Sequence, residues 1–188
     1  MAYTFTEFID DDQVKIDIVT YFDNILKIVK EEGPTWVKFK TRSGIRFINE
    51  IQFEENLVVP SCFVSIHDEI TVLVTELVRL AYFTITDGSD IIPLQLYLCY
   101  YRNGNDICPM HSHKCRQITL SIGSDRIMTV NSRKVNLYNG SVIFLHGEKH
   151  GILKDIVSME SGLTELGFEE NRLSLNLFYT TSTEMQGI

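Results

Sequence analysis

The residues best suited to chemistry are two histidines one position apart in the stretch PMHSHKC, residues 109–115. Side chains at positions i and i+2 of a β-strand point to the same face, so His111 and His113 are predicted to direct their imidazole rings at one point. A metal ion there needs a third ligand from another segment, for which His150 is the first candidate and His146 the second. Three imidazoles that leave coordination positions open suit a catalytic divalent metal. The alternative for a His-x-His pair is two exposed polar residues on a strand.

The cysteines offer a second metal hypothesis, a structural zinc site. It would join the two histidines to Cys115, with Cys108 as the fourth ligand. We rank it low, because three residues on one face of one strand do not easily surround a tetrahedral ion and Cys108 falls on the opposite face. The cysteines, which include Cys62 and Cys99, contain no CxxC pair. We expect them to be thiols in a reducing intracellular compartment, cytoplasmic or nuclear.

A third chemical feature is the stretch RLSLNLFYT, residues 172–180, which alternates as a strand does. One face carries leucines and is expected to lie in the core, and the other carries Arg172, Ser174 and Asn176. An arginine inside a barrel needs an anionic partner, because burying an unpaired charge is costly, and a bidentate carboxylate is the natural one. The alternative, an outward-facing strand with an exposed arginine, is equally compatible with the sequence.

The elements that must position these residues change in character along the chain. Apolar residues at helical spacing predict helices over about 13–31 and 68–83, with a hairpin between them that turns at Ser-Gly. After residue 90 come short strands separated by Asn-Gly turns, over a length suited to a small sandwich or barrel. We therefore predict one α+β domain over residues 1–188, with a helical and hairpin part over 1–90 and a β core over 91–182.

Charge and hydropathy limit the partners. The formal net charge is −8, so the chain as a whole does not attract a phosphate backbone. A nucleic acid would have to meet a local basic strip, for which KFKTRSGIR offers Lys38, Lys40, Arg42 and Arg46, although a solvated hairpin is the favoured interpretation. The N-terminal stretch has no secretory pattern, and no segment reaches the roughly 18 apolar residues of a membrane span. We expect a monomer without a membrane partner.

Taken in order, these segments resemble the AlkB-type 2-oxoglutarate- and Fe(II)-dependent dioxygenases. CYYRNGNDICPMHSHK resembles the family's strand-turn-strand with its His-x-Asp, and ITLSIGSDRIMTV resembles the Ser-x-Gly-x-x-Arg stretch after it. LYNGSVIFLHGEKHGI resembles the strand that leads to the distal iron histidine, and RLSLNLFYT resembles the closing strand. The resemblance covers about residues 94–180. It implies a double-stranded β-helix, or jelly-roll, barrel supported by the N-terminal helices and hairpin.

The resemblance assigns roles by position. It implies that His111 and His150 bind Fe(II), with His113 at the position of the third ligand. The residues that it implies for binding 2-oxoglutarate are Tyr101, Arg172, Ser174 and Asn176. The implied reaction couples oxidative decarboxylation of 2-oxoglutarate to succinate with hydroxylation of a substrate C–H group. In the AlkB group the substrate is usually an N-alkylated base of DNA or RNA, which is demethylated, whereas some relatives act on proteins.

The sequence departs from the family's pattern close to the implied metal. His113 stands where the family has an aspartate, Phe178 where it has a second arginine, and Cys99 where an asparagine is expected. Three neutral imidazoles give the metal no negative charge, so it stays more electron-poor than in a His-Asp-His site, although imidazole is a good ligand for Fe(II). Three outcomes are open: altered chemistry, another divalent metal, or a fold kept after activity was lost.

Two rival hypotheses stay open beside the AlkB-like one. A cupin shares the jelly-roll barrel, and Gly104, the His-x-His pair, Gln117 and Gly123 imitate its first motif, with Gln117 as a possible fourth ligand. The arginine of the closing strand and the helix-rich first third favour the AlkB-like hypothesis. The other rival is a degenerate barrel that serves as a binding or scaffold protein.

Overall fold

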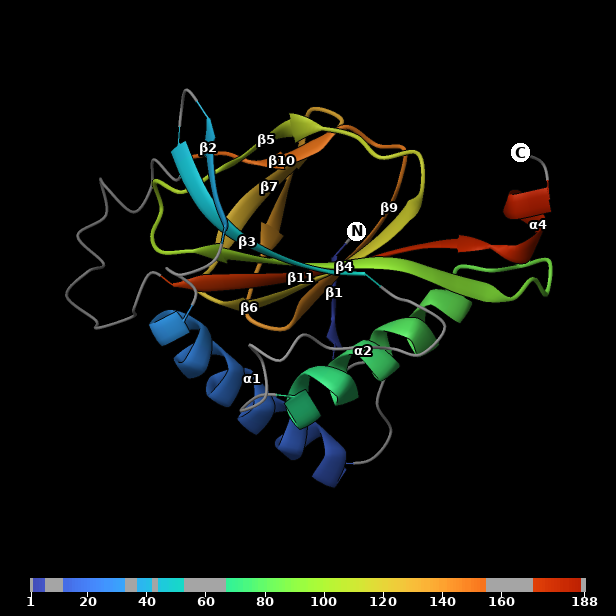
Figure 1. Ribbon diagram of the computed structural model, residues 1–188, viewed down its shortest axis with the longest axis horizontal. Coiled ribbons are helices and arrows are strands. Elements are labelled where there is room, and N and C mark those ends of the chain that lie inside the picture. Colours follow the sequence, from blue (N-terminus) through green and yellow to red (C-terminus); the bar gives the residue numbers. More distant parts are fainter. Residues whose placement is uncertain are drawn as a thin grey trace.

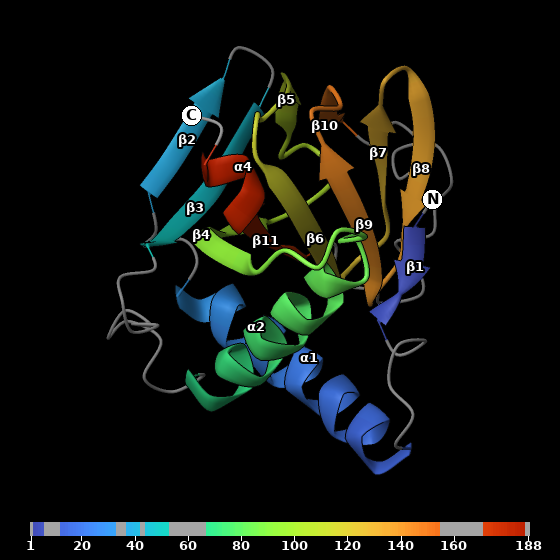
Figure 2. The ribbon, with the colours of Figure 1, turned by 90° about the vertical axis from the view of Figure 1, so that its right-hand side faces the viewer.

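Two antiparallel β-sheets face each other, and two helices cover the outer face of the larger sheet (Figures 1 and 2). The computed structural model describes residues 2–5, 12–32, 37–41, 44–52, 67–154 and 171–186. In both views the smaller sheet lies above the larger one and the helices lie below it. This arrangement confirms the predicted jelly-roll barrel with supporting helices.

Each sheet is built from strands that are far apart in the sequence. The larger sheet consists, in spatial order, of β1 (Ala2–Thr4), β9 (Ser141–His146), β6 (Arg116–Gly123), β11 (Arg172–Thr181), β4 (Ile91–Tyr101), β3 (Gly44–Gln52) and β2 (Val37–Thr41). The smaller sheet consists of β5 (Cys108–His111), β10 (His150–Ile152), β7 (Arg126–Val130) and β8 (Arg133–Leu137). The helices are α1 (Asp12–Glu32), α2 (His67–Tyr82) and the short α4 (Ser182–Gln186).

The two long helices and the hairpin lie where the sequence predicts them. The bounds of α1 and α2 differ from the expected ranges by one residue at each end. The β2–β3 hairpin pairs through β3 with β4, so it extends the larger sheet. Strand β1, which the sequence analysis did not predict, pairs with β9 at the other edge. Among the described helices, none combines the length and the apolarity that crossing a membrane requires.

Strand β11 lies at the centre of the larger sheet and has both faces buried. Leu173, Leu175 and Leu177 are fully buried and pack in one hydrophobic cluster with residues of α1 and α2. Each such side chain contributes about 1.5–3 kcal/mol relative to its exposed state. The alternation of the strand turns Arg172 to the opposite face, where it is also fully buried. This excludes the alternative of an exposed arginine.

Helix α4 ties the end of β11 to the start of β6. Thr181 and Glu184 form a capping box, in which the Glu184 N–H donates to Thr181 Oγ1 at 3.2 Å and the Thr181 N–H donates to Glu184 Oε2 at 3.2 Å. The other carboxylate oxygen, Oε1, accepts from Nε and Nη2 of Arg116 at 3.0 and 2.9 Å. Arg116 is the first residue of β6, so this contact anchors the strand that follows His113.

Substitution of Glu184 tests this anchor. Glu184→Ala removes the cap and the ion pair, which we expect to cost about 1 kcal/mol and to lower the Tm by about 2–4 °C in calorimetry. Glu184→Gln keeps the cap and should lower the Tm less, because a partly exposed ion pair contributes little. Met185→Ala, a change at an exposed neighbour, is the control. A Tm for Glu184→Ala equal to that of the wild type contradicts the assignment.

Candidate metal centre

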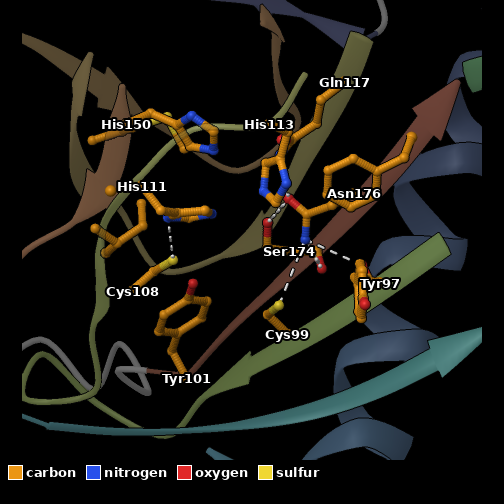
Figure 3. Close-up of a pocket in the computed structure, with 14 residues that line it drawn as sticks. Tyr97, Cys99, Tyr101, Cys108, His111, His113, Gln117, His150, Ser174 and Asn176 are labelled. Atoms are coloured by element: carbon orange, nitrogen blue, oxygen red, sulfur yellow. Dashed lines mark hydrogen bonds between the residues drawn. The ribbon is translucent and has the colours of Figure 1, made fainter. Parts of the chain in front are cut away.

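Three histidines from separate segments surround one point between the two sheets. His111, His113 and His150 each offer a ring nitrogen, and these atoms lie within 4.8 Å of one another. The ring centroids are 4.5 Å apart for His111 and His150, 4.7 Å for His111 and His113, and 5.7 Å for His113 and His150. In Figure 3 the three rings turn toward a common space. Within the described residues, no other His, Cys, Asp or Glu side chains form such a group.

The pairing of β5 with β10 creates this cluster. His150 is the direct cross-strand partner of His111, and side chains at such positions are neighbours on the same face. The two strands approach closely at Gly151, where a Cβ atom would lie 2.7 Å from the carbonyl oxygen of Cys108. Only glycine fits at this contact without moving a backbone. Gly151 therefore positions His150 opposite His111.

His113 reaches the cluster in a different way from the predicted one. Strand β5 ends at His111, and His113 lies in the segment between β5 and β6. The expectation that both histidines lie on one strand is therefore wrong, although their rings do meet. The segment after β5 directs the His113 ring toward the other two rings. The ring packs edge to face on Phe178, with the two centroids 4.6 Å apart.

Backbone carbonyl groups orient two of the three rings. His111 Nδ1 lies 2.7 Å from the carbonyl oxygen of Pro109, and His150 Nδ1 lies 2.9 Å from that of Glu148. A carbonyl oxygen only accepts hydrogen bonds, so each Nδ1 carries the proton and each Nε2 keeps its lone pair. His150 Nε2 is buried and has no hydrogen-bond partner among the described residues. An oriented imidazole with a bare, buried Nε2 fits a metal ligand.

The cysteines and His146 do not join the cluster. Cys108 Sγ lies 3.7 Å from His111 Nδ1, which is the edge of the ring that already faces Pro109. Cys115 is outside the group of clustered ligand atoms. The His146 side chain is half exposed, and its Nε2 lies 4.0 Å from Glu184. The structure therefore assembles neither the zinc set with the cysteines nor the set that uses His146.

The cavity around the histidines has a volume of about 230 Å³. Its lining comes from β4, β6 and β11 on one side and from β5, β7 and β10 on the other, so it lies between the two sheets. None of the described residues that line it carries a carboxylate, an ammonium or a guanidinium group. A metal ion bound to the histidines would keep its full positive charge in these surroundings.

Of the four residues predicted to bind the cosubstrate, three line the cavity and one lies outside its lining. Tyr101, Ser174 and Asn176 line the cavity, whereas Arg172 does not. The Arg172 guanidinium carbon lies 5.0 Å from the centre of the Tyr101 ring, and Nη2 donates to Ser121 Oγ at 2.8 Å. Its Nε and Nη1 have no hydrogen-bond partner among the described residues. Burial lowers the pKa of Arg172, since removing the cation from water is costly.

Asn176 is engaged within the protein at both ends of its amide. Its Nδ2 donates to the carbonyl oxygens of Tyr97 and Ser174 at 3.1 and 3.2 Å. Its Oδ1 accepts from Ser174 Oγ at 3.1 Å (Figure 3). It also accepts from Thr119 Oγ1 at 2.9 Å and from Gln117 Nε2 at 3.3 Å. Asn176 thus organises the wall of the cavity.

Two departures from the family's pattern change the character of this wall. Phe178, at the position of the second arginine, packs on the His113 ring and also meets the Tyr97 ring edge to face, with centroids 5.4 Å apart. Cys99, at the position of the asparagine, accepts a weak hydrogen bond from Asn176 Nδ2 at 3.7 Å. This side of the cavity is therefore aromatic and uncharged.

Sequence reasoning missed several residues that shape the cavity. Tyr97 shares the strand parity of Cys99 and Tyr101 on β4, so alternation was the available signal for it. Arg126 is buried and donates to the carbonyl oxygens of Asp106 and Leu153, both at 2.9 Å. It thereby ties the segment before β5 to the one after β10. The Ser-x-Gly-x-x-Arg pattern contains this arginine, but the sequence analysis assigned it no role.

The structure describes the backbone of Lys38, Lys40 and Arg46, but not the side chains of the predicted basic strip. Lys38 and Lys40 belong to β2, where they pair with Phe47 and Ile45 of β3. Arg42 and the side chains of this hairpin lie outside the described residues. A role for the strip in substrate binding stays a prediction.

The pKa of His150 predicts how the stability of the metal-free protein depends on pH. Burial lowers this pKa below its ordinary value of 6.5. As the pH falls, the unfolded chain therefore binds a proton at His150 before the folded protein does. The contribution of His150 to the free energy of unfolding should be fully present above pH 6.5 and should be lost as the pH drops through the lowered pKa. Denaturant midpoints between pH 8 and pH 5 measure this pH dependence, and His150→Gln should reduce its slope. Equal slopes for the wild type and His150→Gln contradict it.

No protein-family model and no curated protein matches the chain. Among solved structures it is similar to a 2OG-Fe(II) oxygenase family oxidoreductase from Burkholderia pseudomallei, with 12% identity and a TM-score of 0.54 over 82% of this chain and 78% of that one. It is also similar to a predicted oxalate decarboxylase from Thermotoga maritima, with 11% identity and a TM-score of 0.41 over 79% of this chain and 96% of that one.

The similarity to other jelly-roll proteins covers less. The chain matches the DMSP lyase DddQ from Ruegeria pomeroyi DSS-3 with 16% identity and a TM-score of 0.34, over 45% of this chain and only 36% of that one. Of these three matches, the one to the 2OG-Fe(II) oxygenase family oxidoreductase has a TM-score above 0.5, and at 12% identity it shows the fold alone. The chain has the jelly-roll fold of that structure.

Proposed function

We propose that this protein is a mononuclear metal enzyme, an Fe(II)- and 2-oxoglutarate-dependent oxygenase of AlkB type whose carboxylate ligand is replaced by His113. The observation that carries the proposal is the convergence of His111, His113 and His150, with the buried Nε2 of His150 left without a partner. Imidazole is a good ligand for Fe(II), and three of them leave positions open on the metal. Another divalent metal would occupy the same ligands.

The buried arginine supports a carboxylate cosubstrate. Arg172 is fully buried, and two of its nitrogen donors have no partner among the described residues, so an anion would offset the cost of burying it. Tyr101 lies between Arg172 and the cavity and would share in holding that anion. When bound, Fe(II) and 2-oxoglutarate would supply oxidative decarboxylation coupled to substrate hydroxylation. The protein's part is to hold both groups in a cavity closed on two sides by sheets.

The proposed substrate is an N-alkylated base in DNA or RNA, which the order of the four sequence motifs favours. A protein side chain is the second class. The aromatic wall of Tyr97 and Phe178 suits a flat or apolar group. The net charge of −8 gives no general attraction for a nucleic acid, so contact would depend on the Lys38–Arg46 strip.

A cupin-type metal protein is the second candidate function. The observation that favours it is Gln117 Oε1, which is buried, belongs to a residue of the cavity lining and has no partner among the described residues. In a cupin this oxygen would be a fourth metal ligand. Such a protein would need neither Arg172 nor a keto acid.

Metal and keto-acid dependence test the proposed function. We expect the purified protein to bind one Fe(II) per chain and to release succinate from 2-oxoglutarate, faster when methylated oligonucleotides are present. His150→Ala should abolish metal binding and succinate release, whereas His146→Ala should keep both. Metal bound without succinate release would favour the cupin-type candidate or a non-catalytic scaffold. A wild-type protein that binds no divalent metal would contradict both metal-dependent functions.

Restoring the family's aspartate gives a sharper test. His113→Asp should keep iron bound and raise the rate of succinate release, because a carboxylate supplies the negative charge that the cavity lacks. Iron content and succinate formation are measured on the same preparations, with His146→Asp as the control for an added surface carboxylate. If His113→Asp loses its metal, the modified-triad proposal is wrong.

A further inference from the structure

Gln117 carries an unpaired acceptor in the cavity wall. The residue lies on β6, is 4% exposed and lines the cavity of the three histidines. Its Nε2 donates to Thr119 Oγ1 at 2.8 Å and to Asn176 Oδ1 at 3.3 Å. Its Oε1 is buried and has no hydrogen-bond partner among the described residues. The three histidines form the proposed metal centre without this oxygen. The contacts of Arg172 with Ser121 and Tyr101 do not involve it either.

The surrounding hydrogen bonds determine which end of the amide is left over. Asn176 Nδ2 donates to two backbone carbonyl oxygens, which only accept, so Asn176 Oδ1 is an acceptor facing Gln117 and Thr119. The Thr119 hydroxyl donates its only proton to that Oδ1 at 2.9 Å and can only accept from Gln117. Both neighbours therefore need a donor from Gln117. The amide must present Nε2 to them, which leaves Oε1 unpaired.

The environment restricts what can satisfy this oxygen. Gln117 is the cross-strand partner of Phe178, whose ring packs on His113 and Tyr97. A buried acceptor without a partner is costly, so the cavity favours an occupant that donates an N–H or O–H group there. The described lining is uncharged and largely apolar, and its volume of about 230 Å³ is below that of pockets for drug-sized ligands. These surroundings favour a small, uncharged group next to Gln117 Oε1.

We propose that Gln117 is a specificity-determining residue, whose Oε1 accepts a hydrogen bond from an N–H or O–H donor on a small, uncharged, mainly apolar group of the substrate that is bound beside the metal. The inference rests on the metal centre proposed above, but not on iron or on 2-oxoglutarate. It differs from the cupin-type role, in which the same oxygen binds the metal. Related compounds that lack the donor should bind more weakly, and the difference should depend on Gln117.

Pyrazole and 1-methylpyrazole provide a matched pair of probes. Both can bind a metal through one ring nitrogen, but only pyrazole carries an N–H donor next to it. We expect pyrazole to bind the Co(II)-loaded wild-type protein at least about tenfold more tightly, in calorimetry and in the visible Co(II) spectrum. Gln117→Met should reduce the difference severalfold, whereas Gln95→Met, the same change outside the cavity lining, should keep it. An unchanged difference in Gln117→Met overturns the proposal.

Two further readouts separate the remaining outcomes. If Gln117→Met alters the Co(II) content or spectrum without a probe, Gln117 is a metal ligand and the proposal is wrong. If the wild type binds no Co(II), the metal centre itself is contradicted. Should Gln117→Met not fold, the wild type loaded with Zn(II) still decides: the ¹³C shift of the Gln117 amide carbon should move with pyrazole but not with 1-methylpyrazole. Equal shifts with both probes contradict the hydrogen bond.

Discussion

The cross-strand pairing of β10 with β5 is the contact on which the site depends. It places His150 directly opposite His111, although strands β6, β7, β8 and β9 lie between the two residues along the chain. The close approach at Gly151 and the carbonyl contacts of Arg126 hold this pairing in place. Backbone carbonyl oxygens next to this strand pair accept hydrogen bonds from Nδ1 of both rings, so the same region of the backbone sets the position of the imidazoles and leaves Nε2 of each ring with its lone pair.

The residues that the larger sheet contributes to the cavity lining carry no charged group. Strand β11 supplies Ser174 and Asn176, whose polar groups are satisfied by one another and by the backbone, and Phe178, which is apolar. The only guanidinium of this strand face, Arg172, lies behind the Tyr101 ring. A divalent ion here would meet neutral ligands and an aromatic wall, which strengthens its attraction for anions and for lone pairs. The positive charge of Arg172, whose Nε and Nη1 have no hydrogen-bond partner among the described residues, adds to the attraction for anions.

Strand β11 also links the site to the stability of the fold. Its leucine face fills the core against α1 and α2, and its polar face forms the cavity wall, so a change of register by one residue would destroy both. Pairing with β4 and β6 along nearly its whole length holds that register. The capping box of α4 secures the end of the strand and, through Arg116, the start of β6. The position of β11 in the cavity wall therefore depends on the hydrophobic core and on strand pairing, and does not depend on a bound metal ion.

Local sequence patterns determined the parts of this protein that depend on near neighbours in the chain. Helical spacing located α1 and α2 to within a residue, and alternation showed which face of β11 carries Arg172. The histidine set followed from residue type and spacing, but the reason given for His113 was wrong, because a turn and not a shared strand brings its ring to the others. Tertiary structure alone decided that Arg172 lies against the Tyr101 ring and outside the cavity lining, and that Asn176 is engaged within the wall. It also decided that Gln117 Oε1 has no hydrogen-bond partner among the described residues. The physical reason is that periodicity specifies the face of an element, whereas hydrogen-bond partners and burial depend on the residues that the fold brings from elsewhere in the chain.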